Sequence, residues 1–152
     1  MNTDKIQTVE QMPVYQAFLA LALEVEKATR HCGPDFRWLR VQMLRSSESV
    51  CANMSEGFYS QYSTEYLQAL YRCRREARET VTHLQYAASI QAVPAETVMN
   101  IQTRYEEALR QLANLMASID RKIQARGKAK PGGLVKESNA GYATEQEDET
   151  GD

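Results

Sequence analysis

The sequence is poor in cysteine and histidine, on which many metal and redox sites depend. Its 152 residues include three cysteines, Cys32, Cys51 and Cys73, two histidines and no Cys-x-x-Cys motif. An odd, small number of cysteines argues against a disulfide framework and indicates reduced thiols in a cytoplasmic protein. We interpret Cys51 and Cys73 as small hydrophobic core residues. Cys32, in a loop beside His31, is the one candidate for a reactive thiol, and we favour the interpretation that it is inert.

The scarcity of histidine also argues against a metal centre. A carboxylate-bridged di-metal bundle requires a Glu-x-x-His motif on two helices and a glutamate from each of the others. Here His83 follows Glu79 by four residues, and His31 lies in a predicted loop. We interpret Glu76, Glu79 and His83 as polar residues of one helix face, and we expect neither a metal ion nor another cofactor.

Motifs for nucleotide binding and hydrolysis are absent as well. The sequence contains no Gly-x-Gly-x-x-Gly, Walker or Gly-x-Ser-x-Gly motif. Its longest apolar run, residues 14–23, is only half of the ~20 residues that a bilayer requires, and the N-terminus has no apolar signal region. We therefore predict a cytoplasmic protein that is not an enzyme and has no membrane partner and no small-molecule substrate.

Proline and glycine, with four and seven copies, mostly lie at or beyond the ends of predicted helices. We expect Asp35 and Ser63 to cap helices at their N-termini and Gly57 to end a helix in the left-handed conformation. The predicted domain organisation is a frayed segment at residues 1–12, a helical domain at 13–126 and a disordered, acidic tail at 127–152. The four predicted helices span approximately residues 13–31, 35–57, 63–91 and 94–126.

Each predicted helix carries one line of mostly apolar residues at alternating spacings of four and three. This periodicity is typical of helices that bury one face against one another. The short connections favour antiparallel neighbours, so the sequence predicts an all-α, antiparallel, up-down four-helix bundle. The four lines are Val14, Phe18, Leu21, Val25 and Ala28; Leu39, Met43, Ser46, Val50 and Asn53; Tyr66, Leu70, Cys73, Ala77, Thr80, Leu84 and Ala87; and Val98, Ile101, Tyr105, Ala108, Leu112, Leu115 and Ile119.

Two polar residues, Ser46 and Asn53, occupy positions in the second of these lines. A small serine allows a neighbouring helix to come close, and a buried amide must be hydrogen-bonded or it destabilises the fold by about 1–3 kcal/mol. We therefore expect Asn53 to be buried and to hydrogen-bond across the bundle.

The stretch Ala52-Asn53-Met54-Ser55-Glu56-Gly57-Phe58, followed by Glu65-Tyr66-Leu67 and Leu70, resembles a known family. It is similar to the four-helix-bundle proteins encoded by intervening sequences in bacterial large-subunit ribosomal RNA genes. The resemblance covers approximately residues 13–125, with departures at Cys51, Met54, Ser55 and Tyr59. It implies a ring of five subunits and kinship with the accessory proteins of diversity-generating retroelements, but no established activity. The residues assigned to the structural motif are Ser46, Asn53, Glu56, Gly57, Phe58 and Glu65.

Charge is distributed unevenly along the chain. Residues 1–136 contain all 18 Lys and Arg against 14 acidic residues, whereas residues 137–152 contain six acidic residues and no base. A mildly basic body is compatible with an anionic partner, although a salt-bridged surface is the usual interpretation of such clusters. The residues predicted as possible contacts to RNA or DNA are Arg72, Arg75, Arg78, Arg121, Lys122 and Arg126.

Three large apolar residues, Leu19, Leu23 and Trp38, lie outside the predicted core faces. A monomer rarely exposes so much apolar surface, so we predict that they form an oligomer interface. The function that we favour is a non-enzymatic, homo-oligomeric scaffold or adaptor, pentameric according to the resemblance. The alternative is an accessory protein that binds RNA or DNA through arginine-rich outer helix faces.

Overall fold

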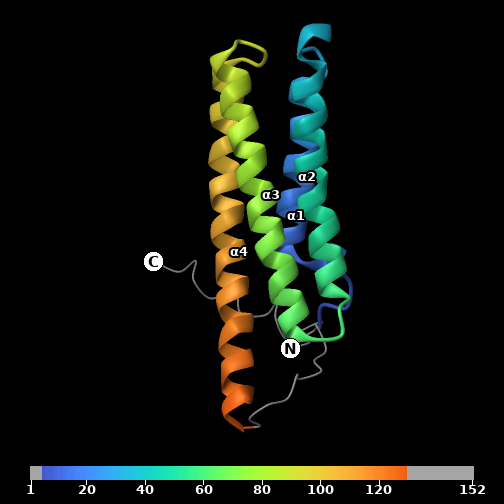
Figure 1. Ribbon diagram of the computed structural model, residues 1–152, viewed down its shortest axis with the longest axis vertical. Coiled ribbons are helices and arrows are strands. Elements are labelled where there is room, and N and C mark those ends of the chain that lie inside the picture. The colour runs from blue at the N-terminus through green and yellow to red at the C-terminus, as the bar shows by residue number, and fades with distance from the viewer. Residues whose placement is uncertain (1–4, 130–152) are drawn as a thin grey trace.

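The computed structural model describes residues 5–129, which form an antiparallel bundle of four helices (Figure 1). This confirms the predicted fold class, whereas the predicted acidic tail beyond residue 129 lies outside the described residues. The α-helices are α1 (Pro13–Thr29), α2 (Arg37–Phe58), α3 (Ser63–Ser89) and α4 (Ala95–Ala129), and two 3₁₀ turns are η1 (Val9–Gln11) and η2 (Pro34–Phe36).

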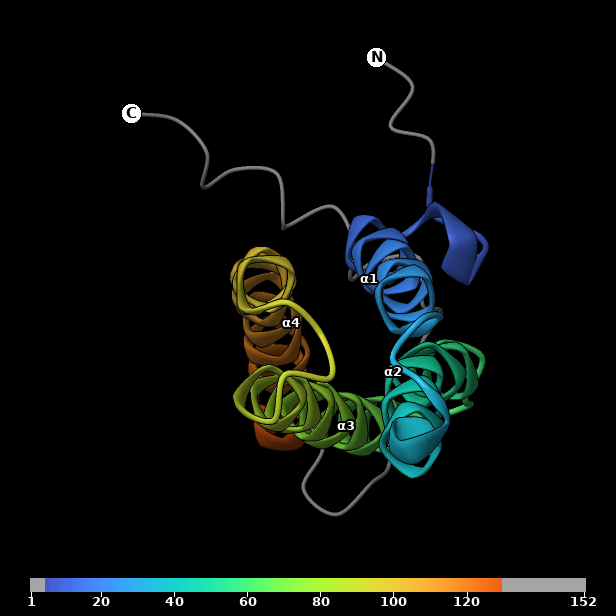
Figure 2. The same cartoon turned by 90° about the horizontal axis from the view of Figure 1, so that it is seen from above.

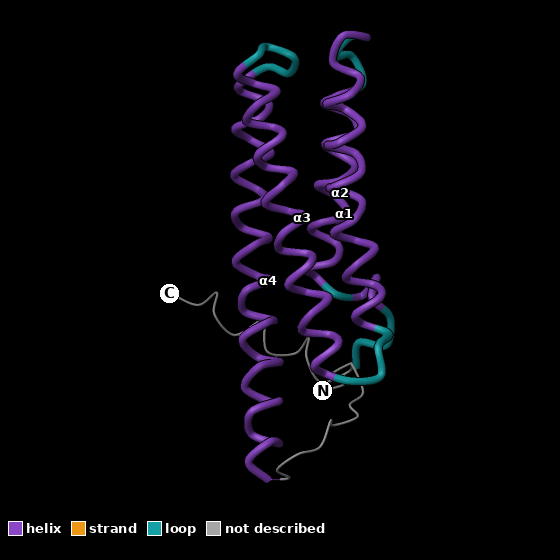
Figure 3. The backbone as a smooth tube through the Cα atoms, viewed as in Figure 1, coloured by secondary structure: helices purple, strands orange, loops and turns teal. Residues whose placement is uncertain are grey.

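Each helix packs against the next one in the chain, and α1 also packs against α4. Seen along the bundle in Figure 2, the helices lie in the order α1, α2, α3, α4 around the axis. The loops between them are short (Figure 3), which is why consecutive helices run in opposite directions. With 35 residues, α4 is the longest helix, and its C-terminal turns project beyond the other helices (Figure 1).

The predicted core faces are the observed core. Apart from the half-buried Ala28 and Asn53, every residue of the four periodic lines is buried. The two largest core side chains, Tyr66 and Tyr105, come from α3 and α4, and burial raises the pKa of both phenols above the usual range. In the described part of the chain, no helix combines the length and the apolar character needed to cross a bilayer.

The sequence predicted a frayed segment at residues 1–12, but residues 9–12 pack against the bundle. The backbone N–H of Val9 donates to the hydroxyl of Tyr59 at 3.2 Å, which ties η1 to the end of α2. Val9 and Met12 are buried against the bundle. The Gln11 side chain accepts hydrogen bonds from the backbone of Gln7 and Thr8, which stabilises the turn. The prediction is therefore wrong for residues 9–12.

The predicted helix caps differ from the observed ones. Asp35 does not cap α2, because Pro34 starts the separate turn η2 and Phe36 occupies the cap position. Ser63 is the first residue of α3, and Tyr62 is its cap. At the other end of α3, the left-handed residue is Gln91, with φ 61°, and the backbone N–H of Ala92 donates to Ala87 O at 2.8 Å.

Gly57 does not end α2 in the left-handed conformation, as the sequence predicted. The helix continues to Phe58, and Gly33 is the only described glycine with a positive φ. Gly57 is required for a different reason: a Cβ added there would lie 2.5 Å from the Cβ of Ala69 and 3.0 Å from Cδ2 of Tyr66. The glycine therefore permits close contact between α2 and α3.

We predict that Gly57→Ala lowers the free energy of unfolding by about 1–3 kcal/mol, because two packed helices must move apart to accommodate the methyl group. Gly127→Ala is the matched control, since no atom lies within 4 Å of a Cβ at this helical position. The control should leave stability unchanged or raise it slightly through the better helix propensity of alanine. Urea unfolding monitored by circular dichroism measures both effects, and equal effects at the two sites would contradict the packing explanation.

Candidate functional site

The family-like motif lies where the end of α2 packs against the beginning of α3. Phe58 is buried, and its ring contacts Tyr59 and Tyr66 edge-to-face, with centroids 5.0 and 6.3 Å apart. Together with the close approach at Gly57, these rings determine how α2 and α3 meet. Gly57 and Phe58 therefore have a packing role.

Polar contacts continue this packing along the two helices. The buried hydroxyls of Ser46 and Thr80 hydrogen-bond at 2.7 Å in the core. Oδ1 of Asn53 accepts a hydrogen bond from Nε of Arg72 on α3 at 3.0 Å, and its amide nitrogen donates to Ser49 O at 2.8 Å. The predicted hydrogen bond across the bundle is thus confirmed, but Asn53 is half-buried rather than buried.

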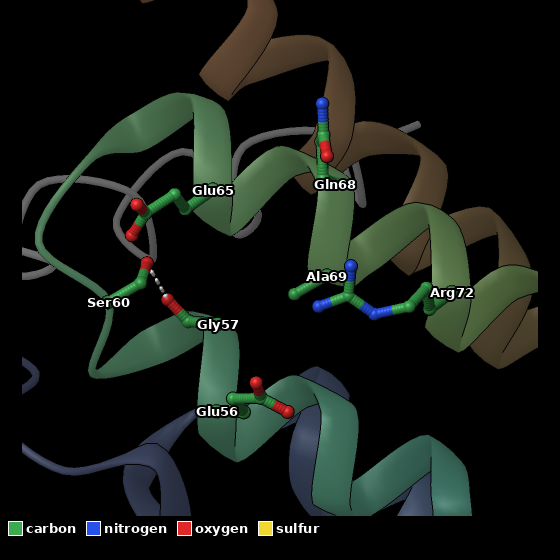
Figure 4. A pocket seen from close by; sticks show the side chains of 7 residues that line it. All are labelled: Glu56, Gly57, Ser60, Glu65, Gln68, Ala69 and Arg72. Atoms are coloured by element: carbon green, nitrogen blue, oxygen red, sulfur yellow. Dashed lines mark hydrogen bonds between the residues drawn. The ribbon is translucent and has the colours of Figure 1, made fainter. Parts of the chain in front are cut away.

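A small polar hollow of about 190 Å³ lies beside this contact (Figure 4). The guanidinium of Arg72 points into it from α3, and the carboxylate of Glu56 faces it from α2. Both Glu56 and Glu65 are exposed to solvent. The polar side chains around the hollow can hydrogen-bond to a polar or charged group of a partner. The residues that line the hollow are Glu56, Gly57, Ser60, Glu65, Gln68, Ala69 and Arg72.

The basic residues of α3 do not form one continuous patch. Arg72 is bonded to Asn53 on α2, whereas Arg78 forms an ion pair with Glu106 on α4 at 2.8 Å. Arg75 lies between them in sequence and is exposed. Arg72 and Arg78 are therefore directed towards different neighbouring helices.

The second basic cluster lies on the last turns of α4, well beyond Glu106, the residue of α4 that pairs with Arg78. Arg121 and Arg126 are exposed, and Lys122 is half-buried. Lys122 and Arg126 already interact with other groups of the chain. Arg121 is therefore the basic side chain of this cluster that is most accessible to a phosphate group.

The predicted interface residues are exposed in the single chain. The exposed fractions are 40% for Leu19, 56% for Leu23 and 55% for Trp38. Five further large apolar side chains are exposed, and their positions outside the periodic lines could have revealed them. These are Val41, Tyr59, Tyr71, Tyr86 and Met99.

The buried thiols and the charged cluster around Glu79 were the remaining candidates for reactive or metal-binding groups. Burial raises the pKa of the Cys51 thiol to about 11 and that of the Cys73 thiol to about 12, so both are protonated and unreactive at neutral pH. Glu79 accepts from Arg45 of α2 at 2.7 Å and lies 3.3 Å from His83. Within residues 5–129, no three His, Cys, Asp or Glu side chains are arranged to bind a metal ion.

Comparison with known proteins agrees with the motif and the fold. The chain is similar in structure to a protein of unknown function of the S23 ribosomal protein family from Bacteroides thetaiotaomicron, with a TM-score of 0.63 and 21% sequence identity. The alignment covers 68% of this chain and 97% of that protein. None of the curated proteins matches the sequence. The profile of the 23S rRNA-intervening sequence proteins matches residues 10–114, and the chain therefore belongs to this family.

Proposed function

We propose that the protein is a non-enzymatic scaffold or adaptor that acts as a homo-oligomeric ring, with five subunits as the family resemblance implies. The observation that supports this proposal is a pair of exposed apolar patches on different faces of the bundle. Patch A consists of Leu19 and Leu23 on α1, and patch B consists of Trp38 and Val41 on α2 with Tyr86 on α3.

Patch A faces away from the core. Leu23 lies two residues from Leu21 and two from Val25, both of which are buried. Two residues correspond to a rotation of about 200° around an α-helix, so Leu23 lies on the opposite side of α1. Leu19 is one turn away and extends the same apolar surface.

Patch B lies on the side of α2 that adjoins α3. The rings of Trp38 and Tyr86 contact each other with centroids 6.0 Å apart and planes at 61°. Arg40, two residues after Trp38, contacts Glu26 of α1 instead, at 3.3 Å. The direction of Arg40 shows that Trp38 points away from α1, so patches A and B are separated around the bundle.

Two different patches on one subunit fit a ring better than a two-fold dimer. In a ring, patch A of one subunit meets patch B of the next, whereas a two-fold interface uses one patch that is complementary to itself. Aromatic side chains are enriched in such interfaces, and patch B contains two of them. The buried, reduced thiols are compatible with a cytoplasmic location, which we include in the proposal.

We predict that the wild-type chain scatters light with a mass several times its monomer mass of 17.3 kDa at micromolar concentration. Leu23→Glu should raise the dissociation constant of the subunit interface at least tenfold, because a carboxylate would be buried between subunits. The mass measured by light scattering should fall accordingly. Circular dichroism should remain helical, since Leu23 lies outside the core.

The matched control is Asn114→Glu, which adds the same charge at an exposed position of α4. It should leave the mass unchanged. A wild-type chain that scatters as a 17.3 kDa particle would refute the ring.

Binding of RNA or DNA is the second proposal, supported by the exposed charges of Arg75 and Arg121. Binding through phosphates must weaken steeply with salt, because each contact releases condensed counterions. We expect a double Arg75→Gln, Arg121→Gln variant to lose salt-dependent retardation of RNA or DNA in a gel. Wild-type protein that retards neither nucleic acid at low salt would exclude this function.

A further inference from the structure

A hollow of about 420 Å³ lies at the connection between α1 and α2. This connection is at the upper end of the bundle in Figure 1. It belongs neither to the family-like motif nor to the two basic clusters described above. All the lining residues come from one short stretch of a single chain. They are Arg30, His31, Cys32, Gly33, Pro34, Arg37 and Arg40.

The loop is shaped by two residues with restricted or unusual backbone conformations. Gly33 has φ 87°, which favours glycine, and Pro34 begins η2. The backbone N–H of Phe36 then donates to Gly33 O at 3.2 Å. This turn brings Arg30, at the end of α1, and Arg37, at the start of α2, to the lining of the same hollow within one chain.

Positive charge exceeds negative charge around the hollow. Glu26 accepts two hydrogen bonds from Nε of Arg30, at 2.8 and 3.0 Å, and also contacts Arg40 at 3.3 Å. It is the only carboxylate in the described residues that pairs with these arginines. The hydrogen bond from Arg30 lowers the pKa of Glu26, which therefore stays ionised but neutralises only one of the guanidinium charges.

Two of the three arginines have unused hydrogen-bonding capacity. The side chain of Arg37 is exposed and makes no hydrogen bond or ion pair with the described residues. Arg40 uses one terminal nitrogen, Nη2, for Glu26, and its other terminal nitrogen has no partner among the described residues. A ligand that brings several acceptor oxygens would supply the partners that Glu26 does not.

We propose that this hollow binds a small phosphorylated ligand of about nucleotide size, whose phosphate is held by Arg30, Arg37 and Arg40. A phosphate presents several anionic acceptor oxygens, and guanidinium groups bind them in pairs of charge-assisted hydrogen bonds. The hollow is large enough for more than the phosphate, because typical ligand pockets measure about 300–1,000 Å³.

A compact ligand fits better than an extended nucleic-acid strand. A strand requires charges in a row along its backbone, whereas these three arginines surround one hollow at a loop. The proposal goes beyond the scaffold function and does not depend on it, because no second subunit is needed to complete the site.

Isothermal titration calorimetry on the full-length protein at low salt tests the proposal with three probes: inorganic phosphate, adenosine 5′-monophosphate and adenosine. We expect the two phosphorylated probes to bind with a Kd below about 1 mM and adenosine not to bind. Arg37→Gln should weaken binding about tenfold or more, since it removes a charged donor. Trp38 is the only tryptophan and directly follows Arg37, so its fluorescence gives a second readout.

Arg110→Gln is the matched control, because it removes the same charge from an exposed position of α4 outside the hollow. It should bind the probes as the wild type does. Arg37 has no partner to lose, so its variant should fold normally, as circular dichroism can verify.

Three results would overturn the proposal. The first is the absence of binding by both phosphorylated probes. The second is binding that Arg37→Gln and Arg30→Gln leave unchanged. The third is binding of a single-stranded oligonucleotide without binding of the mononucleotide, which would indicate a nucleic-acid surface instead.

Discussion

The close contact between α2 and α3 at Gly57 is the constraint on which the rest of the structure depends. Only glycine, which has no side chain, allows the backbone of α2 to lie this close to the methyl group of Ala69 on α3. Once the helices are this close, shorter polar side chains can connect them further along, as Ser46 and Thr80 do at 2.7 Å. The Asn53 contact to Arg72 belongs to the same line of interactions.

This α2–α3 pair determines which surfaces are left for function. The helix α1 packs against α2, α4 packs against α3, and the two outer helices complete the bundle (Figure 2). Patch A on α1 and patch B across α2 and α3 are therefore held at a constant relative orientation. A rigid angle between two patches is what a closed ring needs, since the angle decides how many subunits complete the circle.

The end of the bundle near residue 33 has a different character. Here Glu26 connects Arg30 on α1 with Arg40 on α2, so the charges that stabilise the loop also line the hollow. Arg37 takes no part in that stabilisation and is available to a ligand. A structural ion pair and a binding site can thus share one loop, because three guanidinium groups contain more donors than one carboxylate can accept.

The amino-acid sequence by itself determined the number of helices and their core faces, because burial repeats with the period of the helix and the short loops leave few topologies. It also revealed the family through the residues around Asn53 and Gly57. Only the tertiary structure decided why Gly57 is glycine, since an interhelical distance depends on Ala69 of another helix. The same holds for Val9, whose backbone N–H donates to the hydroxyl of Tyr59, 50 residues away in the sequence. It also holds for Arg30 and Arg40, which both contact Glu26 only because of the way the chain turns between α1 and α2.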